Sequence, residues 1–270
     1  DYRRYPIGIQ NFEQLRNNNC VYVDKTELVY RLTHTDQVYF LSRPRRFGKS
    51  LLVSTLEAYF QGKKDLFRGL AMERLEQDWE SYPVLHIDFS ISKYLSAHYL
   101  RSAINWFLER WEREYGCCVE DKKGTPFSVR LGNVIESAYK KTGKAVVVLV
   151  DEYDSPMLDT NSDVALQGEL RGIMRDFFSP LKGMGQYLRF LFITGISKFS
   201  QMSIFSELNN LQNISMRDDF SAICGTPEEA LAQIDSKQYA VPYQADGRRV
   251  VKVGVNFDSA TRTIGEWIVR

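Results

Sequence analysis

One short stretch of the chain has the residue types and spacing to hold a polyphosphate. SRPRRFGKS ends in Gly48, Lys49 and Ser50, which match the last three positions of the phosphate-binding pattern G-x-x-x-x-G-K-[ST]. Gly48 would let the backbone approach a phosphate closely, Lys49 would reach the β- and γ-phosphates, and Ser50 would bind Mg²⁺. The first glycine of the pattern is absent, because Arg43 occupies its place. Taken alone, the stretch could also be a chance GKS at the start of a helix.

A second stretch supplies the carboxylates that such a site needs. VVVLVDEYD is an apolar run that ends in Asp151 and Glu152. At the end of a strand, Asp151 is expected to hold Mg²⁺ through water, and Glu152 to orient or deprotonate the attacking water molecule. The alternative is a strand that ends in a solvated acidic turn. Both stretches together are rarer by chance than either alone, and they predict a bound nucleoside triphosphate.

A third stretch, FLFITGISK, reads as a buried strand that ends in hydroxyl groups. In ATPases of this kind, the strand between the loop strand and the acidic strand ends in a polar residue that senses the γ-phosphate. Thr194 and Ser197 are the candidates for this role, together with Lys49 and Glu152 in the catalytic set. Ordinary turn residues at the end of a strand are the alternative.

The loop itself is rich in arginine, which cannot copy the backbone freedom of the missing glycine. Its arginines could add positive charge beside the phosphates, or point to solvent and pair with acids. One of the loop arginines could act as an arginine finger, and Arg189, Arg217 or a neighbouring subunit are equally open candidates. We expect the nucleotide to be contacted by Arg43, Pro44, Arg45, Arg46, Phe47, Gly48, Lys49, Ser50 and Leu51.

Strands alternate with helices along the chain, which predicts an α/β fold with a mostly parallel sheet covered by helices on both faces. The β-branched run before Asp151 is typical of a strand buried on both sides. The predicted strands are residues 38–42, 83–90, 145–154 and 187–198, and the predicted helices are residues 49–60, 94–116 and 164–181. In the longest helix, a common face is expected for Leu95, Tyr99, Ile104, Phe107, Leu108 and Trp111.

The composition is that of an ordinary globular protein. Of the 270 residues 44% are hydrophobic and 26% charged, and the formal net charge of +1 gives no global basic field for nucleic acid. No apolar run is long enough to span a membrane, and DYRRYPIGIQNF has no apolar signal core. The four cysteines lack metal-ligand spacing, so we expect free thiols in the reducing cytoplasm.

Several motifs in order resemble the bacterial AAA-ATPase-like proteins. They are PIGIQNFEQLR, YVDKT, RPRRFGKSLL, VVVLVDEYDSPM and RFLFITGISKFS, and the resemblance spans roughly residues 5–225. It implies a P-loop NTPase fold of the ASCE type, in which the arginine-rich loop is the family's own variant. It also implies that residues 6–15 and 22–26 lie near the nucleotide base, although plain N-terminal packing is the alternative.

The same family usually continues into a PD-(D/E)xK nuclease-like domain. We therefore expect an ATPase domain over residues 1–225 and a nuclease-like remnant over residues 226–270, with a helix at 226–234 and strands at 249–258 and 263–270. Gln233 and Tyr239 resemble positions that face the metal site in such domains. The metal-binding acid and the E-x-K strand should precede this helix and are missing, so we expect no nuclease activity from these residues. Either residues are deleted at Gly225–Thr226, or that junction joins two parts of a longer chain.

These patterns predict ATP binding with slow Mg²⁺-dependent hydrolysis, which drives a conformational change passed to a nucleic-acid-processing domain. The absence of an N-K-x-D string favours ATP over GTP. The main alternative is a switch or interaction protein that binds nucleotide without turning it over. A nuclease whose missing half is restored in a longer chain is a third hypothesis. The oligomeric state is left open.

Overall fold

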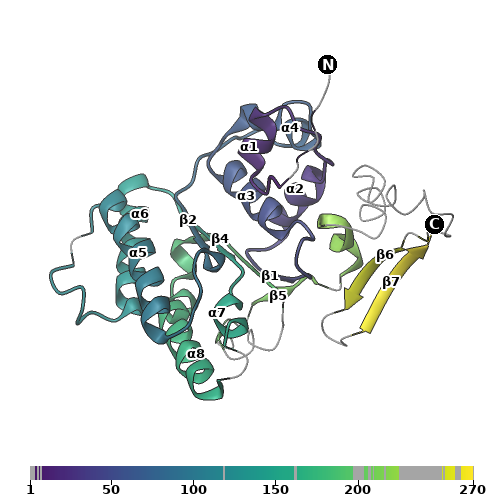
Figure 1. Ribbon diagram of the computed structural model, residues 1–270. Coiled ribbons are helices and arrows are strands. Elements are labelled where there is room, and N and C mark those ends of the chain that lie inside the picture. Colours follow the sequence, from purple (N-terminus) through teal and green to yellow (C-terminus); the bar gives the residue numbers. More distant parts are fainter. Residues whose placement is uncertain are drawn as a thin grey trace.

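In the computed structural model, the described residues are 4, 6, 8–117, 119–160, 163–196, 204, 205, 208, 210–215, 217–224, 251, 253–258 and 263–269. They form an α/β unit with a central sheet and helices on both faces, followed by a separate two-stranded hairpin (Figure 1). The expected α/β fold is thereby confirmed.

Five parallel strands make up the central sheet, in the order β2-β3-β4-β1-β5. Because all five run in the same direction, their carboxyl ends meet at one edge of the sheet. The strand before the glycine-lysine loop (β1) and the strand that leads into the two acids (β3) are separated only by β4, as the sequence predicted. The strands are β1 (Val38–Ser42), β2 (Val84–Asp88), β3 (Val146–Asp151), β4 (Leu188–Gly195) and β5 (Gln212–Asn213).

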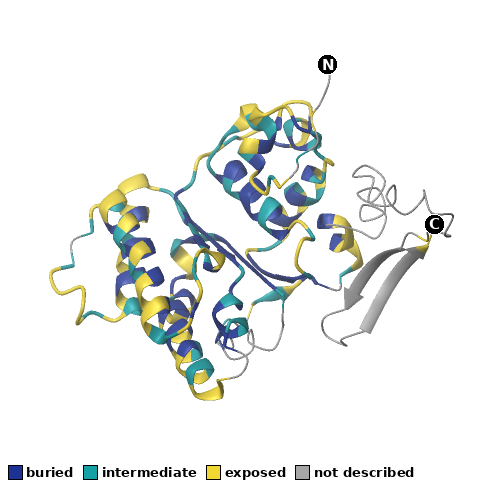
Figure 2. Cartoon of the chain, in the orientation of Figure 1, coloured by how far each residue is buried: buried dark blue, intermediate teal, exposed yellow. Residues whose placement is uncertain are grey.

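Helices cover the sheet in two layers, and the buried strands run between them (Figure 2). One layer holds α1 (Phe12–Asn17), α2 (Thr26–Thr35), α3 (Lys49–Phe60) and α4 (Ala71–Leu75). The other holds α5 (Ala97–Tyr115), α6 (Phe127–Thr142), α7 (Ser155–Leu158) and α8 (Val164–Phe178). Short 3₁₀ turns are η1 (Lys64–Phe67), η2 (Phe89–Ile91), η3 (Ser179–Lys182), η4 (Gly185–Tyr187) and η5 (Asp218–Ile223).

The alternation of side chains along β3 decides which way its terminal acid points. Val147 and Leu149 pack in the α3 layer, whereas Val146, Val148 and Val150 pack in the α5 layer. Successive side chains of a strand point to opposite faces, so Asp151 continues the series of Val147 and Leu149. The carboxylate therefore lies on the same side of the sheet as the amino end of α3.

The expected common face of the long helix is wrong for two residues. Leu95 and Tyr99 are 70% and 46% exposed, whereas Ile104, Phe107, Leu108 and Trp111 are buried. Leu95 precedes the first helical residue, and Tyr99 is five residues before Ile104, about 140° around a helix.

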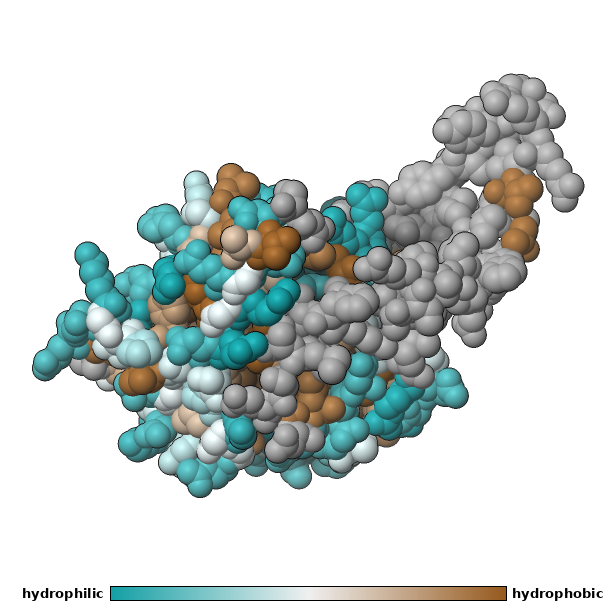
Figure 3. Space-filling model, turned by 90° about the horizontal axis from the view of Figure 1, so that it is seen from below, coloured by the Kyte–Doolittle hydropathy of each residue, from teal (hydrophilic) through white to brown (hydrophobic). Residues whose placement is uncertain are grey.

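On the face of the molecule shown in Figure 3, hydrophilic residues predominate among the coloured ones. Of the described helices, none combines the length and apolar character that crossing a bilayer requires.

A buried ion pair ties α5 to α6. The Arg130 side chain is 0% exposed and donates two hydrogen bonds to Glu112, from Nε at 2.7 Å and from Nη2 at 2.9 Å. A third bond, from Nη1 to Asn105 Oδ1, measures 2.6 Å. The planar guanidinium reaches these acceptors from three different nitrogen atoms, a spread that the single nitrogen of an ammonium group cannot match.

Arg130→Lys is therefore expected to lower the free energy of unfolding by about 2 kcal/mol, because it weakens a two-pronged ion pair that stays buried. Denaturant titration of the full chain measures this change. Arg101→Lys, at an exposed position of α5, is the control and should change stability very little. Equal stability of the two variants would contradict a structural role for the buried pair.

A histidine–carboxylate pair joins α3 to the edge strand β2. His86 Nδ1 lies 2.9 Å from Glu57 Oε2. Burial lowers the pKa of His86, but the hydrogen bond and charge of Glu57 outweigh it and raise the pKa above the ordinary 6.5. Burial likewise raises the pKa of Glu57, and the bond and charge of His86 outweigh it and leave the pKa below 4.5.

The pair should stabilise the fold in a defined pH window. The histidine contribution is present below pH 6.5 and is lost as the pH rises through its raised pKa. The glutamate contribution is present above pH 4.5 and is lost as the pH falls through its lowered pKa. Glu57→Gln should thus lower the free energy of unfolding by about 1 kcal/mol near pH 5.5, and by less near pH 8. A loss that is the same at both pH values would contradict this assignment.

The C-terminal hairpin consists of β6 (Val253–Asp258) and β7 (Thr263–Val269), which pair antiparallel. The sequence predicted strands in both places, and the structure confirms them. The expected helix at 226–234, Gln233, Tyr239 and the Gly225–Thr226 junction lie outside the described residues. The proposed division at residue 225 remains a prediction.

Candidate nucleotide-binding site

Residues 43–48, here called the arginine loop, connect β1 to α3 at the carboxyl edge of the sheet. Gly48 caps α3 with φ of 80°, a left-handed conformation that glycine adopts without steric cost. Arg46 has φ of 68°, which is unusual for a residue with a side chain. The loop therefore delivers the chain to a twelve-residue helix whose first amide groups have no partner within the helix. Such an end attracts anions.

The arginine that replaces the first glycine is turned inward. The buried Arg43 guanidinium donates to the carbonyl oxygens of Ser42, at 3.2 Å, and of Ser215. Its backbone N–H donates to Gly195 O at 3.1 Å. Burial lowers the pKa of Arg43, as expected for a cation withdrawn from water. The side chain anchors the loop, and the expectation that it also contacts phosphate stays a prediction.

Lys49, the first residue of α3, is only 3% exposed and lies beneath the arginine loop. Its Nζ donates to the carbonyl oxygens of Arg43, at 2.9 Å, and of Pro44, at 3.0 Å. The same Nζ lies 3.5 Å from Glu152 Oε1. The glycine-lysine stretch and the acidic strand therefore meet in space, which is the arrangement that the sequence predicted.

Thr194, at the end of β4, holds the two acids in place. Its hydroxyl donates to Asp151 Oδ1 at 2.5 Å and accepts the Glu152 backbone N–H at 3.3 Å. Glu152 has φ of 54°, a strained conformation for a non-glycine residue. This bend ends the alternation of β3 and brings the Glu152 carboxylate to Lys49. The expected role of Thr194 as a phosphate sensor stays a prediction.

The oxygen groups at this edge suit a hard cation. Ser50 follows Lys49 in the first turn of α3, and the buried Asp151 carboxylate lies on the same side of the sheet. Mg²⁺ is commonly held by one or two protein oxygens plus the phosphates of its substrate. Among the described residues, no group of three His, Cys, Asp or Glu side chains could hold a metal unaided. Ser50 and Asp151 thus fit a magnesium ion that arrives with a polyphosphate.

Two residues that the sequence analysis did not assign shape the same edge. A Cβ atom added to Gly195 would lie 2.4 Å from Tyr153 Cε1, so only glycine fits at the end of β4. The fully buried Asp154 accepts the Ile196 backbone N–H at 2.9 Å and fixes the chain just after that glycine. Asp154 ends the string VVVLVDEYD, and Gly195 lies in FLFITGISK. Their buried contacts required the fold to be seen.

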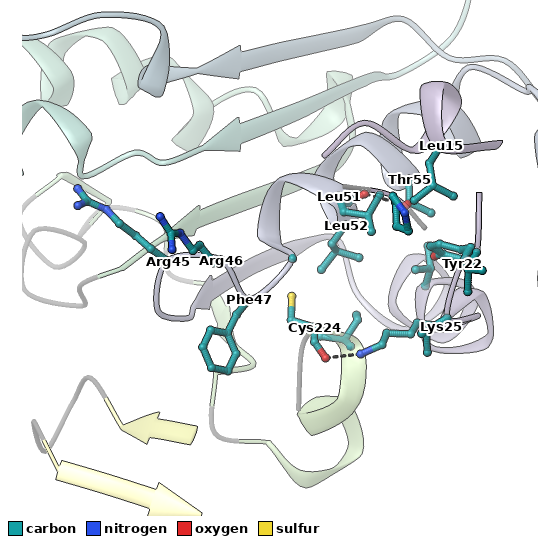
Figure 4. Close-up of a pocket in the computed structure, with 16 residues that line it drawn as sticks. Leu15, Tyr22, Lys25, Arg45, Arg46, Phe47, Leu51, Leu52, Thr55 and Cys224 are labelled. Atoms are coloured by element: carbon teal, nitrogen blue, oxygen red, sulfur yellow. Dashed lines mark hydrogen bonds between the residues drawn. The ribbon is translucent and has the colours of Figure 1, made fainter. Parts of the chain in front are cut away.

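A cavity of about 550 Å³ opens beside the arginine loop (Figure 4). One wall comes from α3 and the loop, with Phe47, Gly48, Leu51, Leu52 and Thr55. Another comes from the upstream segment, with Pro6, Leu15, Val21, Tyr22, Val23, Lys25 and Val29. Burial raises the pKa of Tyr22, so its hydroxyl stays protonated. The sequence analysis expected residues 6–15 and 22–26 near a nucleotide base. Five of their residues line this cavity next to the loop, namely Pro6, Leu15, Tyr22, Val23 and Lys25, and the contact with a base stays a prediction.

The arginine candidates lie in different places. Arg45 and Arg46 are exposed residues of the arginine loop and are among the residues that line the cavity (Figure 4). Arg189 is near the amino end of β4, where its side chain donates to Thr33 O at 3.3 Å. The site lies at the carboxyl end of the strands, so the prediction that Arg189 acts as an arginine finger within its own chain is wrong. Arg217 pairs with Asp219 at 2.7 Å. Ser197 lies outside the described residues.

The sheet order, the loop–helix junction and the paired acids define the class of fold, which is that of the P-loop NTPases. The family described as "Predicted AAA-ATPase" matches residues 6–205, and the PD-(D/E)XK nuclease superfamily matches residues 207–267. The chain belongs to the AAA-ATPase-like family. Both matches fit nucleotide binding.

One relative from Azotobacter chroococcum mcd 1 is an uncharacterized protein in the vnfD 5′ region, 40% identical over 228 residues. The match covers 84% of this chain and 43% of the relative, so the chain spans less than half of that protein's length. No solved structure matches the chain.

Proposed function

We propose that the chain binds ATP with Mg²⁺ and hydrolyses it slowly. The observation that carries the proposal is the meeting of Lys49 with Glu152, at 3.5 Å, next to an Asp151 carboxylate held by Thr194. Cation, carboxylates and a helix amino end thus share one side of the sheet edge. Phosphoryl transfer depends on this combination of positive charge, metal ligands and a group that orients water.

Each group has a role in the proposed reaction. The Gly48–Ser50 amides and Lys49 hold the β- and γ-phosphates, and Lys49 exchanges its loop carbonyls for phosphate oxygens. Ser50 and Asp151 hold Mg²⁺, which neutralises the charge of the phosphates when bound. Glu152 loses its ionic partner as Lys49 turns to the phosphates. The Glu152 carboxylate can then orient the attacking water molecule or accept a proton from it. Thr194 keeps Asp151 in position.

The cavity beside the loop would take the adenine base and ribose. Its volume of about 550 Å³ and its largely aliphatic lining suit a small planar ring system. It adjoins Gly48 and Leu51, so a base in the cavity places the phosphates at the start of α3. The work obtained from ATP would pass to the nuclease-like region and, through it, to nucleic acid, as the second family match suggests.

Two measurements on the full chain test the proposal. Equilibrium dialysis with radiolabelled ATP should show saturable binding that is stronger with Mg²⁺ than with EDTA. Steady-state phosphate release should exceed the protein-free background and require Mg²⁺. Saturable binding without release would favour the nucleotide-dependent switch. Absence of ATP binding would contradict the proposal.

A further inference from the structure

We propose that the described residues of the segment 212–224, which lies beyond the AAA-ATPase match, complete the nucleotide site. Ser215 positions the arginine loop, and Ile223 with Cys224 forms the third wall of the base cavity. This inference rests on the proposed function and assigns residues to that site from a region that matches the nuclease superfamily.

The first part of the segment continues the edge of the sheet as far as the loop. The pairing of β5 with β1 ends at Asn213, and the Ile214 N–H then donates to Phe40 O at 3.0 Å. One residue later, a side chain replaces the ladder: Ser215 Oγ accepts the Ser42 backbone N–H at 2.8 Å. The two hydroxyl oxygens are 3.1 Å apart, and both side chains are buried. Ser215 thereby fixes the last residue before the arginine loop.

This contact accounts for the arginine in place of the pattern's first glycine. A buried guanidinium must have acceptors, because an unpaired cation inside a protein is costly. The Arg43 guanidinium donates to Ser42 O and Ser215 O, so one of these two acceptors belongs to the segment. The arginine loop lacks the tight turn that the first glycine of the pattern would make. The hydrogen bond from Arg43 to Ser215 O holds the start of the loop in its place.

The second part of the segment closes the base cavity. η5 packs against α2 and β1, where the Phe220 ring lies 5.6 Å from the Arg31 guanidinium and 6.4 Å from the Tyr39 ring. Directly after it, Ile223 and Cys224 line the cavity. Lys25 Nζ, from the upstream wall, donates to Cys224 O (Figure 4). The cavity is therefore walled by residues within the AAA-ATPase match and by two residues beyond it.

The two ends of the segment should affect different halves of the ligand. Ser215→Ala leaves the Ser42 N–H without its acceptor and should weaken ATP binding about tenfold, with adenosine binding unchanged. Ile223→Ala removes cavity wall and should weaken ATP and adenosine alike, also about tenfold. Ser221→Ala is the matched control: among the described residues, this exposed hydroxyl donates within η5, to Asp218 O at 2.9 Å. Neither affinity should change.

Equilibrium dialysis of ATP and of adenosine, with all variants in the full chain, measures this split, and thermal melts confirm that each variant is folded. In the wild type, ATP should also slow amide hydrogen exchange within Asp218–Ile223, a readout that needs no substitution. The wild type could bind ATP without slower amide exchange in Asp218–Ile223, and Ser215→Ala and Ile223→Ala could both keep the wild-type affinity for ATP. In that case the inference is wrong and the proposed function stands. Equal loss of ATP and adenosine in Ser215→Ala would also overturn it. If the wild type binds no ATP, the proposed function fails and the inference with it.

Discussion

Replacing Lys49 with methionine is expected to weaken Mg²⁺–ATP binding by about 100-fold, or about 3 kcal/mol. The Lys49 ammonium is almost fully buried at the start of α3, and its three partners in the structure are Arg43 O, Pro44 O and Glu152 Oε1. A triphosphate would replace the weaker carbonyl contacts with charge-assisted bonds. Methionine keeps the length and packing of the side chain and removes only the charge and the donors. Isothermal titration of ATP measures the change.

Lys63→Met is the matched control for this experiment. Lys63 also forms an ion pair, with Glu13, but it is much more exposed and lies at the other end of α3. ATP affinity should be unchanged in this variant. A Lys49→Met protein that is folded and binds ATP as tightly as the wild type would contradict the assignment of the arginine loop.

Replacing Glu152 with glutamine should lower the rate of phosphate release by about 100-fold to 10,000-fold and leave ATP binding within about twofold. The carboxylate lies at the mouth of the site, on a residue with φ of 54° that brings it to Lys49. Glutamine preserves the shape of the side chain but cannot accept a proton from water. Single-turnover hydrolysis with excess protein separates this chemical step from product release.

Glu169→Gln, on the exposed side of α8, is the control for loss of one negative charge and should keep the wild-type rate. Near-zero rates in both the wild type and Glu152→Gln, with ATP binding retained, would instead support the non-hydrolysing switch. A hydrolysis rate that falls in step with ATP affinity would mean that Glu152 serves binding and not the reaction.

Local patterns were sufficient to predict the elements that carry the site. The helix expected over residues 49–60 is α3, with the same bounds, and the β-branched run before Asp151 is a strand buried on both faces. The meeting of Lys49 with the acids also followed from the sequence, because parallel strands place their carboxyl ends at one edge. In each case the signal lies in a short stretch of chain and a general rule of α/β folds.

Other features could not be predicted, because they depend on residues far apart in the chain. The Arg43–Ser215 bond joins positions 172 residues apart, and β5 has only two residues, too few for a periodic pattern. The exposure of Tyr99 was missed because aromatic residues were assumed to face the core. No local pattern shows that Thr194 bridges Asp151 and the Glu152 amide, since that geometry requires the sheet order.

The central claim is that the arginine loop and the paired acids form one pocket for a metal-bound triphosphate. Crystals of the full chain grown with Mn²⁺ and a non-hydrolysable ATP analogue test it most directly, through the anomalous scattering of the metal. The account predicts one Mn²⁺ bound directly by Ser50, at about 2.2 Å, and through water by Asp151, with the triphosphate within hydrogen-bonding reach of Lys49. A triphosphate and metal bound away from both Lys49 and Asp151 would contradict it.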